Sequence, residues 1–203
     1  MNPDMEQWKN VLDPKILKSN LEFIALYIAL YERLEDTIIS RIIDFYSVNK
    51  SDNKRYHDKV LELYDPKKCP KINNKSTRLI SSLIWLLNRD AITDNDILII
   101  SNLKTERNKL THEMFDIITL GLPKDIHLRF LDMIKVFNKI EKWWIVEVEI
   151  PTSYDFEDVS DIDFKNVMSG NMCILQLILN ITQNGSNKDF EEICKKLNVW
   201  KIV

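Results

Sequence analysis

The sequence predicts an all-α protein, a single-domain bundle of about six helices that spans residues 1–203. Glycine is scarce, with three residues in 203, and long stretches repeat apolar residues at steps of three or four, the period of an amphipathic helix. A chain of this length can bury most of the apolar surface that it exposes when unfolded. Its composition, 45% hydrophobic and 29% charged, is that of a folded globular protein and excludes a disordered one.

The first part of the chain predicts two helices separated by a basic loop. Apolar residues recur at helical spacing from Pro14 to about Val48, so we expect one long amphipathic helix there. Residues 49–75 are polar and contain prolines, which predicts a loop with one short helix near residues 58–64. The helical period returns over residues 76–91 and predicts a second main helix.

The next two helices are expected between residues that favour helix ends. Thr93, with Asp96 three residues later, is a variant of the capping box and predicts a helix that continues to about residue 120. Gly121 suits the end of that helix. Pro123 fits the first turn of another helix, whose apolar pattern continues up to a pair of adjacent tryptophans.

The C-terminal part is less regular. Residues 145–150 alternate apolar and acidic side chains, which is compatible with a short strand. Residues 151–164 form an expected acidic loop, with five acids and no basic residue between Tyr154 and Phe164. A largely apolar helix over residues 164–183 and a short amphipathic helix over residues 186–197 complete the prediction.

Positive charge is concentrated in one segment, although the formal net charge is −3. From Lys50 to Arg78 there are nine basic residues against four acids. Such a segment can gather RNA phosphates through point-charge contacts, but a solvated loop is the commoner arrangement.

The cysteines and the hydropathy pattern indicate the compartment. The three cysteines are far apart and lack metal-ligand spacing, so neither a disulfide framework nor a zinc site is expected. No carboxylate cluster has metal-ligand spacing either, and we expect neither a metal nor a cofactor. The longest apolar run, residues 23–31, is too short to cross a bilayer, and the N-terminus lacks the pattern of a signal peptide. We therefore expect a cytoplasmic protein without membrane contact.

One segment of the third main helix, expected from Thr93 to about residue 120, carries residue types suited to catalysis. It reads Thr105-Glu106-Arg107-Asn108-Lys109-Leu110-Thr111-His112-Glu113. Histidine exchanges protons near neutral pH, and arginine is a permanent forked donor that suits a phosphate. A histidine base acting on a ribose 2′-hydroxyl, with an arginine on the non-bridging oxygens, would cleave a phosphodiester without a metal and leave a cyclic phosphate. Asn108 would orient the imidazole or the substrate, because it lies four residues before His112 on the same helical face.

Arg107, Asn108 and His112 resemble the R-x4-6-H signature of the HEPN ribonuclease superfamily, including the polar residue that follows the arginine. The resemblance implies a helical homodimer in which both copies of the motif face one cleft. It implies an endoribonuclease with these three catalytic residues, acting as a toxin or in defence against phage. Such proteins often work beside an antitoxin, sometimes a nucleotidyltransferase. Lys104, Lys109 and Thr111, next to the motif, are the expected substrate-binding residues.

Helical geometry separates Arg107 from His112. On a regular helix the two residues stand about 140° apart, so they cannot share one face. Arg107 falls instead near the stripe of Leu103 and Leu110, a costly position for a guanidinium unless it is paired or borders a polar cavity. Either the helix is distorted near this point or the site is assembled between two chains, and the resemblance favours the second.

Two other readings of the motif remain open. The chain can be a HEPN-like interaction or nucleotide-binding module without catalysis, although such members commonly lose the arginine or the histidine. It can also be an unrelated bundle with a chance motif, for which a buried His112 would be the sign. In either case His112 would be satisfied by Glu113 or Asp116, Arg107 would pair with Glu106 or Glu113, and Asn108 would be solvated.

Overall fold

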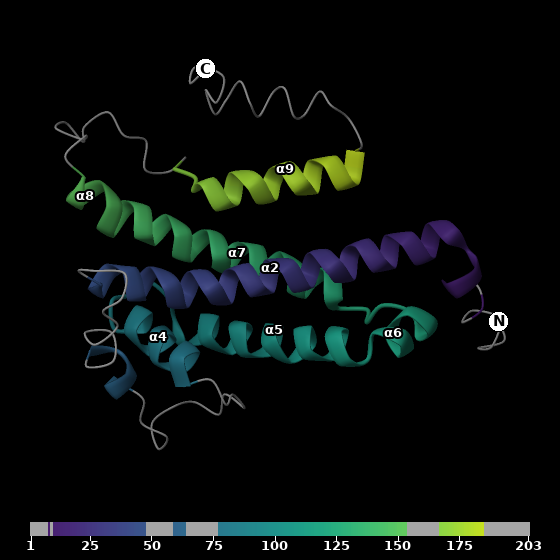
Figure 1. The fold of residues 1–203 in the computed structure, drawn as a ribbon, viewed down its shortest axis with the longest axis horizontal. Helices are drawn as coiled ribbons and strands as arrows, with labels where there is room; N and C mark the ends of the chain where they lie inside the picture. Colours follow the sequence, from purple (N-terminus) through teal and green to yellow (C-terminus); the bar gives the residue numbers. More distant parts are fainter. Residues whose placement is uncertain (1–7, 9, 48–58, 64–76, 154–166, 185–203) are drawn as a thin grey trace. The chain divides into compact units, whose positions relative to one another are not determined.

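The computed structural model describes residues 8, 10–47, 59–63, 77–153 and 167–184, and most of these residues are helical with no strand among them (Figure 1). The all-α prediction is confirmed. None of the described helices combines the length and apolar character that a membrane span requires. The chain divides into two compact units, residues 1–137 and residues 138–203.

Helix α2, Pro14–Tyr46, is the central element of the first unit and confirms the predicted long helix. Asp13 caps its first turn, because the carboxylate accepts a hydrogen bond from the backbone N–H of Lys15 at 2.9 Å. The helix packs against α4 (Thr77–Leu87), α5 (Asp94–His112) and α6 (Met114–Leu120). Its buried stripe forms much of the core and consists of Ile24, Tyr27, Leu30, Tyr31, Leu34, Ile38 and Ile42.

Aromatic contacts join α2 to its neighbours at both ends. Near its start, the ring of Phe23 lies 5.4 Å from that of Phe130 on α7 (Ile126–Trp144). Near its end, Tyr46 accepts a hydrogen bond of 2.9 Å from the indole N–H of Trp85 on α4. These contacts fix the helix against elements that lie far along the chain from it.

The predicted capping box sets the start of α5. The backbone N–H of Asp96 donates to Thr93 Oγ1 at 3.3 Å, and the backbone N–H of Thr93 donates to Asp96 Oδ2 at 2.8 Å. Both donors would otherwise lack a partner at the helix start. The preceding helix α4 ends at Leu87, earlier than predicted, in a turn where Asp90 adopts a positive φ of 57°.

The prediction of one helix from Thr93 to about residue 120 is wrong. Glu113 leaves the helical conformation, with φ −114° and ψ 24°, and separates α5 from α6. Gly121 ends α6 as predicted, with a φ of 97° that favours glycine. Helix α7 then begins at Ile126, so Pro123 stands in the connection and not in the first helical turn.

The second unit contains a π-helical turn in the segment whose sequence is compatible with a short strand. Residues Ile145–Glu149 continue from α7 as a π-helix, and α8, Ile150–Thr152, follows directly. The backbone at Trp144 and Ile150 is right-handed helical. The alternating apolar and acidic residues between them therefore belong to a continuous helix and not to a strand. Pro151 lies in this last turn, and the chain becomes extended at Ser153.

Helix α9, Gly170–Asn184, corresponds to the predicted helix over residues 164–183 and starts later than expected. Within this unit, the Asn171 side chain donates a hydrogen bond of 3.0 Å to Glu141, whose side chain is fully buried. In the basic loop, a 3₁₀ turn at Leu61–Leu63 lies inside the predicted short helix. The rest of that loop, most of the acidic loop and the predicted helix over residues 186–197 lie outside the described residues.

The buried tyrosines of α2 predict a loss of stability at alkaline pH. Burial raises the pKa of Tyr27 and of Tyr31 above the ordinary value of about 10. The folded state therefore keeps these protons, whereas the unfolded chain releases them near pH 10, so their contribution to stability is complete below that pH and is lost as the pH rises beyond it.

The test compares the parent with a variant carrying Tyr27→Phe and Tyr31→Phe. Urea unfolding followed by circular dichroism from neutral pH to about pH 11 should show a shallower decline for the variant. Equal slopes for the two proteins would contradict the assignment.

Candidate functional site

Arg107, Asn108 and His112 all lie in the second half of α5, which is a continuous α-helix up to His112. The break at Glu113 comes just after the motif and does not bring its members together. The separation of about 140° between Arg107 and His112 therefore holds in the folded chain. Among the described residues, no side-chain hydrogen bond links His112 to Arg107 or Asn108.

Arg107 faces helix α2. Its Nη2 forms an ion pair and hydrogen bond with Glu32 on that helix, and its Nη1 donates to Asn108 Oδ1 at 3.0 Å. The side chain is 28% exposed, and its Nε is buried without a hydrogen-bond partner. The sequence-based expectation of a pair with Glu106 or Glu113 is wrong. A neighbouring helix supplies the partner, which local spacing on α5 could not reveal.

A second ion pair lies one turn earlier along the same helix contact. Lys104 Nζ lies 3.2 Å from Glu35 Oε1, and both side chains are largely shielded, at 18% and 22% exposure. The buried Tyr31 interacts with these charged groups: burial raises its pKa, the Glu35 carboxylate raises it further, and Arg107 lowers it in part. Lys104, an expected substrate-binding residue, is thus engaged in holding α5 against α2.

The two other expected substrate-binding residues also have partners within α5. Lys109 Nζ lies 3.4 Å from Glu106 Oε1, although the lysine side chain is 51% exposed. Thr111 Oγ1 donates a hydrogen bond of 2.9 Å to the carbonyl of Arg107. Bonding to a carbonyl four residues earlier is usual for a helical threonine and needs no ligand to explain it.

His112 is the last residue of α5 and is exposed to solvent. Its imidazole makes no hydrogen bond or ion pair with the described residues, so the expected partners Glu113 and Asp116 do not hold it. The burial that would indicate a chance motif is absent. An exposed imidazole on the same helical face as Asn108 is accessible to a ligand.

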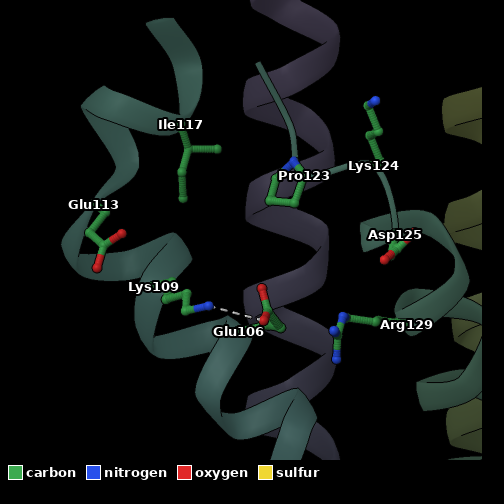
Figure 2. A pocket seen from close by; sticks show the side chains of 8 residues that line it. All are labelled: Glu106, Lys109, Glu113, Ile117, Pro123, Lys124, Asp125 and Arg129. Atoms are coloured by element: carbon green, nitrogen blue, oxygen red, sulfur yellow. Dashed lines mark hydrogen bonds and ion pairs between the residues drawn. The ribbon is translucent and has the colours of Figure 1, made fainter. Parts of the chain in front are cut away.

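A surface pocket adjoins the motif. It has a volume of about 210 Å³ and lies between the end of α5, α6 and the start of α7 (Figure 2). The lining residues share a high charge and are Glu106, Lys109, Glu113, Ile117, Pro123, Lys124, Asp125 and Arg129. Glu106, Lys109 and Glu113 lie three and four residues apart, next to the motif residues in the sequence. Sequence reasoning did not single out the contribution of the connection into α7, because its role depends on where that connection folds back.

Nothing in the described parts of the chain gathers three or more histidine, cysteine, aspartate or glutamate side chains that could hold a metal ion.

No protein-family model, curated protein or solved structure matches this chain. The resemblance to HEPN ribonucleases therefore continues to depend on the motif and on its place in a helical bundle.

The contact between Glu32 and Arg107 predicts a small, salt-sensitive coupling. We expect a double-mutant cycle with Glu32→Gln and Arg107→Gln to give about 0.2–1 kcal/mol, because both side chains remain partly exposed and water screens the pair. The free energy of unfolding from urea titrations at low and high salt measures it. A coupling of zero at low ionic strength would show that the pair is not formed in solution.

Proposed function

We propose that the chain is a metal-independent endoribonuclease of the HEPN type that acts as a homodimer. The observation that carries the proposal is the contact between Arg107 and Asn108 beside an exposed, uncommitted His112. Arg107 and Asn108 are in contact, and His112 lies one turn further along α5 on the same face as Asn108. They supply a phosphate ligand, an orienting amide and a proton acceptor.

In the proposed reaction, the imidazole of His112 accepts the proton of a ribose 2′-hydroxyl. The 2′-oxygen then bonds to phosphorus while the bond from phosphorus to the 5′-oxygen breaks. The protonated imidazole returns its proton to the departing oxygen, which leaves a 2′,3′-cyclic phosphate and a 5′-hydroxyl. Arg107 stabilises the charge that develops on the non-bridging oxygens. Asn108 uses its oxygen to hold Arg107, and its amide N–H₂ remains available for substrate.

The proposed site is composite because one copy of α5 presents its two principal groups in different directions. Arg107 and His112 of one chain stand about 140° apart around the helix axis. Arg107 of a second chain therefore reaches a phosphate at His112 more readily than Arg107 of the same chain does. In a two-fold dimer the two copies are equivalent, so each cleft receives a histidine from one chain and an arginine from the other.

Glu32 is the resting partner of Arg107 in this proposal. A carboxylate and a phosphate compete for the same forked guanidinium donors. The glutamate side chain is 51% exposed, so it can rotate into solvent when RNA arrives. The buried Nε of Arg107, which has no partner, is a further donor that a phosphate oxygen could satisfy.

The same ion pair favours a second candidate function. If Glu32 stays bound to Arg107, the chain is a HEPN-like interaction or nucleotide-binding module without catalysis. A role as a toxin or in phage defence, and a partner such as an antitoxin or a nucleotidyltransferase, belong to the ribonuclease proposal alone. Growth arrest on induced expression would favour the ribonuclease.

The proposal predicts that His112→Ala lowers RNA cleavage by about a hundredfold or more, since it removes the general base. Purified parent and variant are incubated with a labelled RNA in EDTA, and the ends of the products are analysed. The control is His127→Ala, which alters another exposed histidine, one that packs on Phe23, and should cleave like the parent. Cleavage by His112→Ala at the parental rate would reject the assignment.

A composite site predicts complementation between two inactive variants. Arg107→Ala and His112→Ala, each inactive alone, should regain roughly a quarter of parental cleavage when mixed and allowed to exchange subunits. Half of the dimers would then contain both variants, with one intact site of two. If the mixture stays inactive while mass spectrometry shows mixed dimers, each site is formed within one chain.

A further inference from the structure

The pocket beside the motif contains groups that the proposed reaction does not use. Arg129 projects from α7 into this pocket, is partly buried, and forms no ion pair with the described residues. Figure 2 shows Glu106 among the lining side chains, joined to Lys109 on one side and with Arg129 on the other. The Glu106 side chain is only 12% exposed. A nearly buried acid and an unpaired guanidinium in one small hollow indicate a polar ligand.

Charge and size limit what the pocket can hold. Its lining has three acids and three basic residues, which balance, so it favours a neutral ligand with both donors and acceptors over a free phosphate or a cation. Its volume of about 210 Å³ is below the ~300–1,000 Å³ of pockets for drug-sized ligands, which leaves room for one small ring system. Ile117 and Pro123 offer apolar surface to a flat ring.

We propose that this pocket binds a single unstacked guanine base of the RNA. Guanine has acceptors at O6 and N7 next to donors at N1 and N2, which matches a guanidinium and a carboxylate side by side. Arg129 would donate to O6 and N7, and Glu106 would accept from N1–H and N2–H₂. Single-stranded RNA is commonly read by bases that leave the stack and bind along these edges.

The position of the pocket connects it to the candidate site. Glu106, Lys109 and Glu113 line the pocket and alternate along α5 with the motif residues. RNA that lies over His112 can therefore place a neighbouring base in the pocket. This inference depends on the proposed function for its substrate, and it adds a base preference that the motif alone does not supply.

Calorimetric titration of the full chain with the 5′-monophosphates of guanosine, adenosine, cytidine and uridine tests the pocket. The parent should bind the guanosine nucleotide most tightly. Glu106→Gln and Arg129→Gln should each weaken that binding by roughly tenfold or more and remove the preference. The matched controls are Glu22→Gln and Lys135→Gln, which change the same charges at exposed ion pairs outside the pocket and should bind like the parent. Circular dichroism and the unfolding midpoint show that each variant is folded.

Equal affinity for the four nucleotides, no binding at about a millimolar concentration, or guanosine nucleotide binding that survives both pocket substitutions would overturn the inference. A His112→Ala arm separates it from the proposed function. If this variant binds the guanosine nucleotide and the parent cleaves no RNA, the pocket is supported and the ribonuclease is rejected. RNA cleavage without a base preference would support the ribonuclease and reject the pocket.

Discussion

The packing of α5 against α2 is the constraint on which the rest of this structure depends. Helix α2 presents a stripe of buried residues to three neighbouring helices, and acids at its edge reach α5. The ion pairs Glu32 with Arg107 and Glu35 with Lys104 both join α2 to α5, and their charges act on the buried Tyr31. Apolar contact supplies most of the stability of such an interface, and the charged pairs fix which way α5 is turned. That orientation decides which side of the motif meets α2 and which meets solvent.

The orientation of α5 decides what each residue of the motif contacts. Arg107 is held toward α2, His112 points to solvent at the end of α5, and Asn108 contacts the arginine from the intermediate position. In the proposed ribonuclease, RNA would displace Glu32 before it gains the guanidinium of Arg107. The proposed base pocket beside Glu106 would add binding energy through a base and not through a phosphate. Phosphate recognition, proton transfer and base recognition would then involve three neighbouring parts of α5.

The sequence predicted the helices far better than the site. Periodicity and capping residues located the long helix from Pro14 and the start of α5 at Thr93, since both signals are local. The break at Glu113 and the π-helical continuation after Trp144 escaped prediction, because neither is marked by proline or glycine. Helical geometry correctly separated Arg107 from His112. The role of Glu32, however, depends on a contact between residues 75 positions apart, and the pocket depends on how the connection into α7 folds, which no pattern within α5 encodes.

The affinity for RNA when Glu32 no longer holds Arg107 tests the central claim, that this arginine is the phosphate ligand and the glutamate its resting partner. Fluorescence anisotropy with a labelled single-stranded RNA would compare His112→Ala, which prevents turnover, with the same chain carrying Glu32→Gln in addition. Glu22→Gln in the same background controls for the loss of one acid on α2. We expect Glu32→Gln to tighten RNA binding beyond this control, and we expect the further substitution Arg107→Gln to abolish the gain. Binding that is unchanged by Glu32→Gln, or a gain that persists without Arg107, would contradict it.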